Sequence, residues 1–272
     1  MPILADCHLH SCFSGDSDAP MEAMIQRAIS LGLSHMCFTE HMDLDFPQTP
    51  ESPAGMFELR TDDYRAALME CRKRYEGQIQ IGFGVELGMQ PHINAENARY
   101  TNACDFDFVI ASTHLVDRMD PYESAYFAGR SQEEAYRRYF EAELESIASY
   151  TDYDVYGHID YVIRYGRTRD KEYCYEKYAD LFDRMIDLLL SAQKGIELNT
   201  GGLRKGLRQP HPCTPFLKRY RKMGGAVLTV GSDAHRAADV ASHFGQAAEV
   251  LTDCGFTHYC TFRQRRPTFH RL

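Results

Sequence analysis

Histidines and carboxylates recur in short motifs, each directly after an apolar run. These motifs are D-C-H-L-H at 6–10, T-E-H at 39–41, G-V-E at 84–86, S-T-H at 112–114, G-H-I-D at 157–160, E-L-N at 197–199 and S-D-A-H at 232–235. His8 and His10 lie on the same side of a strand because strand side chains alternate with period two. Clustered carboxylates repel one another unless cations separate them. Mixed imidazole and carboxylate ligands favour Zn, Fe or Mn over Mg or Ca, so the motifs predict a transition-metal site.

The elements that must position these motifs alternate along the whole chain. We predict strands at Ile3–His8, Met36–Thr39, Ile79–Val85, Phe106–Ser112, Val155–His158, Gly195–Leu198 and Ala226–Val230. We predict helices at Pro20–Leu31, Thr61–Tyr75, Ile93–Ala103, Gln132–Tyr150, Glu172–Gln193, Pro215–Met223 and Ala238–Cys254. Seven βα units in succession indicate an α/β fold with a parallel sheet. In a parallel barrel all carboxyl strand ends lie on one rim, so the motifs would converge there.

Composition narrows the class of protein further. The 272 residues are 44% hydrophobic and 25% charged, and no repeat or linker divides them, so we expect one globular domain over residues 1–272. The formal net charge of −9 argues against nucleic-acid binding. Met1–Ala5 is too short for a signal or membrane segment. Nine cysteines without a C-x-x-C pair are typical of reduced thiols in a cytoplasmic protein.

Other polar residues lack this strand-end placement or have two interpretations. His35, His92, His211, His243, His258 and His270 are expected to be ordinary surface or core histidines. Glu40, next to His41, either supports a metal ligand from behind or is a plain surface carboxylate.

Taken in order, the motifs D-x-H-x-H, [DE]-H, E, H, H and S-D-A-H resemble the polymerase and histidinol phosphatase (PHP) superfamily. Four longer segments resemble its monofunctional histidinol-phosphate phosphatase branch: H-S-C-F-S-G-D-S-D at 10–18, F-T-E-H-M-D at 38–43, H-I-D-Y-V-I-R-Y-G at 158–166 and E-L-N-T-G-G-L-R-K-G at 197–206. The resemblance covers nearly the whole chain. It implies a distorted (β/α)7 TIM-like barrel that holds two or three divalent metal ions.

The resemblance also implies which residues bind each ion. The first ion would be bound by His8, His10, Glu86 and Asp233. Glu86 would bridge to a second ion, which His114 and His158 also bind. The third ion would be bound by Asp16, His41 and His235. The S-G-D-S-D loop offers Asp18 as an alternative to Asp16, although position matching favours Asp16.

The implied reaction is hydrolysis of a phosphomonoester by a metal-bound hydroxide, since a bound water can lose its proton near pH ~7. The family pattern places Arg164 and Arg204 to bind the phosphate, and their planar guanidinium groups suit that task. The protein general acid stays open: Asp160 is one candidate, but a structural role is equally compatible with its position.

The implied substrate is L-histidinol phosphate, in histidine biosynthesis. Its cationic amine would need carboxylates, for which the loops offer Asp43, Asp45, Asp117 and Asp120. The alternative substrate is another small phosphomonoester, such as a nucleotide or a sugar phosphate. A non-catalytic barrel that assists a polymerase is a third hypothesis, disfavoured because every ligand position is filled.

Overall fold

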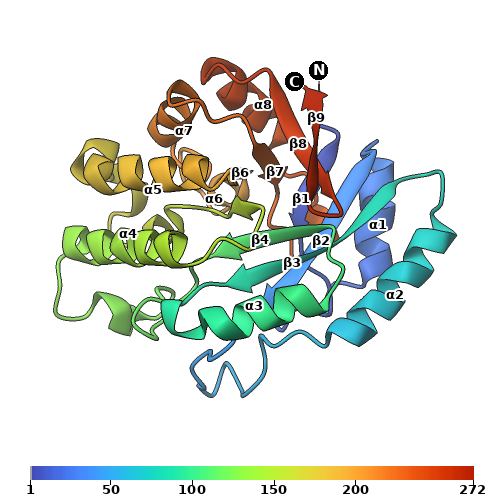
Figure 1. Ribbon diagram of the computed structural model, residues 1–272, viewed down its shortest axis with the longest axis horizontal. Helices are drawn as coiled ribbons and strands as arrows, with labels where there is room; N and C mark the ends of the chain where they lie inside the picture. The colour runs from blue at the N-terminus through green and yellow to red at the C-terminus, as the bar shows by residue number, and fades with distance from the viewer. Residues whose placement is uncertain (1) are drawn as a thin grey trace.

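The computed structural model describes residues 2–272 as a parallel β-sheet surrounded by helices (Figure 1). The strands are β1 (Ala5–Leu9), β2 (His35–Met42), β3 (Gln80–Gly88), β4 (Phe108–Ser112), β5 (Val155–Tyr156), β6 (Gly195–Asn199) and β7 (Leu228–Gly231). They pair in chain order, each parallel to the next. The segments after β1 and β7 meet where the His10 N–H donates to the Ala234 carbonyl at 2.9 Å. The sheet is therefore a nearly closed barrel, which confirms the predicted (β/α)7 fold.

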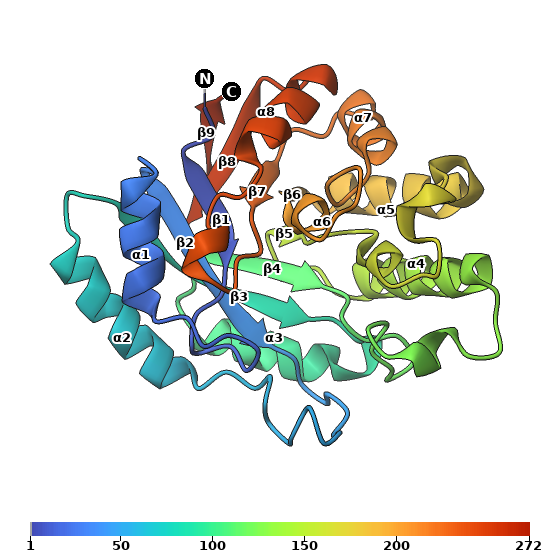
Figure 2. The ribbon, with the colours of Figure 1, turned by 180° about the vertical axis from the view of Figure 1, so that it is seen from behind.

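The helices lie around the strands in both views (Figures 1 and 2). They are α1 (Met21–Ser30), α2 (Thr61–Arg74), α3 (Asn94–Ala103), α4 (Gln132–Ser149), α5 (Ala179–Ser191), α6 (Gly201–Arg204), α7 (Thr214–Lys222) and α8 (Phe244–Asp253). Local sequence explains several boundaries. Ser131 and Glu134 form a capping box that starts α4. Leu181, Met185 and Leu189 recur at helical spacing and are buried, which holds α5 against the barrel.

Two predicted helices begin later than expected. The stretch predicted as Glu172–Gln193 contains a short 3-10 turn, Tyr175–Tyr178, before α5 begins at Ala179. The stretch predicted as Ala238–Cys254 becomes helical only at Phe244. Ala241 and His243 there have φ angles of 53° and 60°, a left-handed conformation that a continuous helix does not allow.

The chain ends in a hairpin that the sequence did not predict. Strands β8 (His258–Arg263) and β9 (Arg266–Arg271) pair antiparallel and lie beside β1 in both views (Figures 1 and 2). Gln264 and Arg265 connect them with positive φ angles of 49° and 62°. Two-residue hairpin turns usually carry Asn-Gly or Asp-Gly, and that signal is missing here.

Across residues 2–272, no helix has both the length and the apolar character that crossing a bilayer requires.

Candidate metal centre

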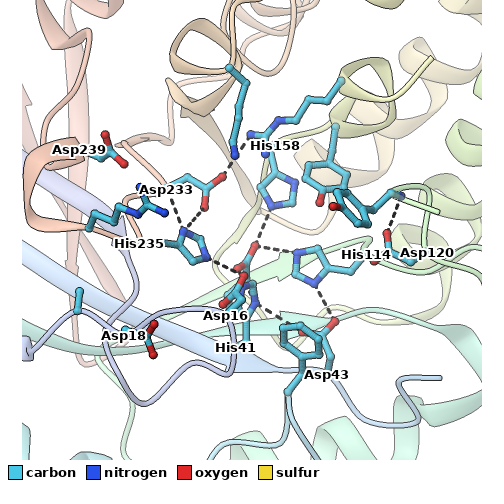
Figure 3. A pocket seen from close by; sticks show the side chains of 18 of the residues that line it. Asp16, Asp18, His41, Asp43, His114, Asp120, His158, Asp233, His235 and Asp239 are labelled. Carbon is cyan, nitrogen blue, oxygen red and sulfur yellow. Dashed lines mark hydrogen bonds and ion pairs between the residues drawn. The ribbon is translucent and has the colours of Figure 1, made fainter. Parts of the chain in front are cut away.

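The carboxyl ends of the strands surround a cavity of about 950 Å³, part of which is drawn in Figure 3. Seven of the nine predicted ligands line it, and His8 and His10 are fully buried beside them. Ligand atoms of eight of the nine form four sets of three, each within 4.8 Å, and the ninth residue, Asp16, lies 3.0 Å from His235. The sets are His10, His41 and His235; His8, His10 and Asp233; His8, Glu86 and His158; and His41, Glu86 and His114. The structure thus brings all nine predicted residues together at one rim.

Glu86, at the carboxyl end of β3, lies at the centre of this cluster. Its Oε1 is 2.8 Å from His158 Nε2 and 3.2 Å from His114 Nε2. Its Oε2 is 3.1 Å from His8 Nε2 and 3.4 Å from His10 Nε2. The two oxygens therefore face two different sets of imidazoles, which is the arrangement required of a carboxylate that bridges two cations.

A third set lies on the opposite side of His10. Asp16 Oδ2 is 3.0 Å from His235 Nε2 and 3.6 Å from His41 Nε2. The rings of His41 and His235 each stack on the His10 ring, and each ring centroid lies 4.2 Å from the centroid of His10. Asp18 also lines the cavity but forms no ion pair with these imidazoles in the described residues (Figure 3). The geometry therefore favours Asp16 over Asp18.

Several buried polar atoms in the cluster form no hydrogen bond among residues 2–272, although oppositely charged groups lie within ion-pair distance of them. They include Glu86 Oε2, His41 Nδ1 and His235 Nε2. Buried polar atoms in folded proteins are normally hydrogen bonded. Because these atoms belong to imidazoles and a carboxylate that face one another, a divalent cation is the group that would satisfy them. The residues present fit a metal centre.

The surrounding charges keep the carboxylates of the cluster ionised, which is the form that binds cations. Burial alone would raise the pKa of Glu86, but the neighbouring imidazoles, first His8, hold that pKa well below its usual value. Burial would likewise raise the pKa of Asp233, and His8 and Arg164 hold it well below the ordinary range. Conversely, Glu197 and Glu86 overcome burial and raise the pKa of His8. Metal binding to such a cluster should release protons from the imidazoles.

Buried carboxylates hold the imidazoles from behind. Glu197 Oε1 is 2.7 Å from His8 Nδ1, and Asp43 Oδ1 is 2.7 Å from His114 Nδ1. Such contacts fix the ring orientation of a metal-binding histidine. Asp43 is one of the four candidate carboxylates for the substrate amine, and this contact gives it a different task. Glu197 begins the E-L-N motif that closes β6, so its position near the strand end is visible in the sequence, but the sequence assigns it no role.

Glu40 also supports the cluster. It is fully buried and accepts hydrogen bonds from the Ser11 N–H at 3.0 Å and from Ser14 Oγ at 2.6 Å. Ser14 Oγ lies 3.0 Å from His10 Nδ1, so Glu40 supports His10 through this serine. The interpretation of Glu40 as a surface carboxylate is wrong.

Both predicted arginines line the cavity. Arg164 Nη2 is 3.2 Å from Asp233 Oδ2. Arg204 donates from Nη2 to the Asp233 carbonyl at 2.6 Å and forms an ion pair with Asp239 at 3.0 Å. Asp160, by contrast, is fully buried and is not among the residues that line the cavity. Its position disfavours a role as general acid.

A seven-stranded parallel barrel with imidazoles and carboxylates gathered at its carboxyl rim defines a class of metal-binding α/β barrels. Residues 6–201 match the PHP domain, and the chain belongs to the PHP domain family. It is 30% identical to the histidinol-phosphatase of Lactococcus lactis over 259 residues, which cover 94% of this chain and 93% of that protein. It is also 30% identical to a probable histidinol-phosphatase of Clostridium acetobutylicum, with coverages of 92% and 93%.

Solved structures agree with this assignment. The crystal structure of histidinol phosphate phosphatase from Lactococcus lactis, complexed with zinc, L-histidinol and phosphate, superposes with a TM-score of 0.88 at 28% identity. The match covers 97% of this chain and 98% of that one. The putative histidinol phosphatase of Listeria monocytogenes matches with a TM-score of 0.75 at 18% identity and supports the fold alone.

Proposed function

We propose that this chain is a metal-dependent histidinol-phosphatase that hydrolyses L-histidinol phosphate to L-histidinol and phosphate in histidine biosynthesis. One observation carries the proposal: a guanidinium group, that of Arg164, lies 3.2 Å from a carboxylate of the metal cluster, Asp233. Cationic phosphate-binding groups and metal ligands therefore share one cavity. The similarity to the Lactococcus lactis enzyme, which is complexed with zinc, L-histidinol and phosphate, supports the same substrate.

We propose that two or three divalent ions, Zn, Fe or Mn, bind here. The residues that would hold them are His8, His10, Asp16, His41, Glu86, His114, His158, Asp233 and His235. When bound, such ions lower the pKa of water and neutralise phosphoryl charge. Arg164 and Arg204 bind the remaining phosphoryl oxygens, because a guanidinium donates charge-assisted hydrogen bonds to phosphate.

The carboxylate for the substrate amine is Asp120. Of the other loop candidates, Asp45 pairs with His92 and Arg118, and Asp117 pairs with Arg138. Asp120 lines the cavity and forms no ion pair with a cation of residues 2–272. Burial raises the pKa of Asp120 to about 6, so a cationic ligand beside it would be stabilising.

We further propose that residues 1–272 act as one domain in the cytoplasm, without a nucleic-acid or membrane partner. All nine cysteines are free thiols, as expected in a reducing compartment. A net charge of −9 repels a phosphate backbone.

A substrate panel with metal analysis tests this function. Protein purified without chelator should contain two or three transition-metal ions per chain. At equal concentration, histidinol phosphate should be hydrolysed in preference to a nucleotide and a sugar phosphate. Preference for one of those two would instead make the chain a phosphoesterase for another small phosphomonoester. Full activity in metal-free protein would contradict the metal dependence. If metal-loaded protein hydrolysed none of the substrates, the hypothesis of a non-catalytic barrel would be favoured instead.

Asp120→Asn tests the amine contact separately. The variant should lose about tenfold in kcat/KM for histidinol phosphate, since a hydrogen bond to a charged group contributes about 1.5–3 kcal/mol. Hydrolysis of phenyl phosphate, which has no amine, should be unchanged. Asp45→Asn, a loop carboxylate outside the cavity, is the matched control. Equal losses on both substrates would show that Asp120 does not recognise the amine.

A further inference from the structure

Two buried side chains hold Arg164 from behind. Arg164 Nε donates to His211 Nε2 at 2.9 Å, and His211 Nδ1 lies 2.5 Å from Asp160 Oδ1. His211 and Asp160 are fully buried, and neither lines the cavity. We propose that Asp160 and His211 are positioning residues that orient Arg164 toward the phosphate. This role rests on the phosphatase function proposed above.

The hydrogen bonds determine the tautomer of His211. An arginine Nε–H only donates, so His211 Nε2 must be the acceptor. The ring proton therefore lies on Nδ1 and is donated to Asp160. A neutral imidazole with one acceptor and one donor matches both neighbours, whereas an imidazolium would direct an N–H at Arg164. Asp160 thus controls whether His211 can accept from the guanidinium at all.

Both members of the pair are held by the backbone. The Cys213 N–H donates to Asp160 Oδ2 at 2.8 Å. The main chain of His211 exchanges two hydrogen bonds with Asn199, at 2.7 and 2.9 Å, where β6 ends. A Cβ added at Gly202 would lie 3.0 Å from His211 Nε2, so the backbone of α6 packs closely over the ring. The ring has little freedom to rotate away from Arg164.

The contacts leave one nitrogen of the Arg164 guanidinium, Nη1, available. Nε is bound to His211, and Nη2 is bound to Asp233 at 3.2 Å. The guanidinium carbon lies 4.7 Å from the centre of the Tyr161 ring. Among the hydrogen bonds of residues 2–272, none uses Nη1 of Arg164. Without His211, Asp233 would be the main anchor and would draw the guanidinium toward the metal cluster.

Asp160→Asn should reverse the tautomer without touching the cavity. The Asn side-chain oxygen would keep the Cys213 N–H, so its amide N–H would face His211 Nδ1. That nitrogen must then accept, and the ring proton moves to Nε2, where it meets the Nε–H of Arg164. Two donors would face each other, and the guanidinium should turn away from its present orientation.

Calorimetric binding of inorganic phosphate to the metal-loaded protein, with metal content and kcat/KM measured alongside, tests the pair. Asp160→Asn and His211→Leu should each weaken phosphate binding about tenfold, the loss expected of one charge-assisted hydrogen bond. Metal content should stay unchanged. His211→Gln should recover part of the loss, because its amide oxygen can accept from Arg164. In the His211→Gln background, Asp160→Asn should add little, since glutamine has no tautomer to reverse.

Asp154→Asn is the matched control, because Asp154 is buried and bonded to Arg265 at 2.7 Å, outside the cavity. Its phosphate affinity should equal that of the wild type. Normal phosphate affinity in both Asp160→Asn and His211→Leu would overturn the proposal, and so would a parallel loss of metal. If His211→Leu does not fold, the effect of Asp160→Asn on phosphate affinity is compared between the wild-type and His211→Gln backgrounds. An equal loss in both backgrounds would overturn the proposal. The proposed function fails separately, if the wild type binds phosphate but hydrolyses no phosphomonoester.

Discussion

The two ends of the barrel bury carboxylates in different surroundings. At the amino end, Asp107 precedes β4 and accepts hydrogen bonds from Arg72 at 2.5 Å and from the Phe83 N–H at 3.1 Å. Asp154 precedes β5 and accepts from Arg265 at 2.7 Å and from the Val109 N–H at 2.8 Å. Each carboxylate therefore has one guanidinium and at least one backbone donor, and its hydrogen-bonding capacity is used within the protein.

At the carboxyl end, carboxylates face imidazoles instead. Glu86 and Asp233 meet histidines from several strands, and Glu86 Oε2 and His235 Nε2 keep unused bonding capacity in the described residues. The difference shows that burial of charge alone does not mark a functional site. The two ends differ in whether hydrogen-bond partners within the protein satisfy every buried carboxylate and imidazole. A buried polar atom without a hydrogen bond is unfavourable until a ligand binds to it.

The largest effect should come from Glu86→Gln, which removes the charge shared between two ion sites. We expect loss of at least one ion and a fall in turnover of about a hundredfold or more, since changes behind metal ligands alone reduce activity by about 10- to 100-fold. The metal-free variant should unfold like the metal-free wild type. Elemental analysis, steady-state kinetics and thermal unfolding measure these quantities. Wild-type activity in this variant would show that Glu86 does not bridge.

Arg164→Ala and Arg204→Ala test the cationic part of the same rim. Each should lower kcat/KM roughly ten- to a hundredfold with metal content unchanged, because each removes a charge-assisted contact to phosphate. Inhibition by phosphate should weaken in parallel, and lysine should restore only part of the activity. Arg204 also donates to the Ser232 and Asp233 carbonyls, so its loss should destabilise the fold as well. Unchanged phosphate inhibition in both variants would show that these arginines do not bind phosphate.

Asp107→Asn tests the opposite end. Because Asp107 is bonded to Arg72 and to backbone N–H groups, the variant should lose about 1.5–3 kcal/mol of stability. Activity per folded molecule should not change, since the residue is remote from the cavity. Urea unfolding and active-fraction kinetics of the metal-loaded protein check both parts. Lost activity at full stability would mean that the two ends are coupled.

Glu143, in α4, is a third kind of buried carboxylate, because neither oxygen has a partner in the described chain. Burial, followed by the charge of Asp160, raises its pKa well above 4.5. The folded protein keeps this proton while the unfolded chain releases it above pH 4.5, so the contribution of Glu143 to the stability of the folded protein falls as pH rises above that value. Glu143→Gln removes the proton uptake. Its stability advantage should widen by about 1.4 kcal/mol per pH unit. Urea unfolding at about pH 5.5 and 6.5 measures this change, and a pH-independent advantage would contradict it.

Much of the site follows from local patterns. The two-residue period of β1 places His8 and His10 on one side, and Glu86 lies near the carboxyl end of β3, so both positions are visible in the sequence. The strand predicted to end at Thr39 places Asp43 in the following loop, which makes it one of four candidates for the substrate amine. The observed β2 continues to Met42, which places Asp43 directly behind His114. A shift of three residues in one strand end therefore replaces a candidate role in substrate binding with a contact to a metal ligand.

The sequence by itself determined that apolar runs alternate with amphipathic helices and that metal-type side chains follow the runs. These properties depend on residues close together in the chain. Only the tertiary structure decided the contacts behind the ligands. His211 and Asp160 are 51 residues apart and were assigned no joint role, yet they meet because the segments after β5 and β6 fold over the same arginine. Local periodicity places side chains on a face, but hydrogen-bond partners across loops depend on how the barrel closes.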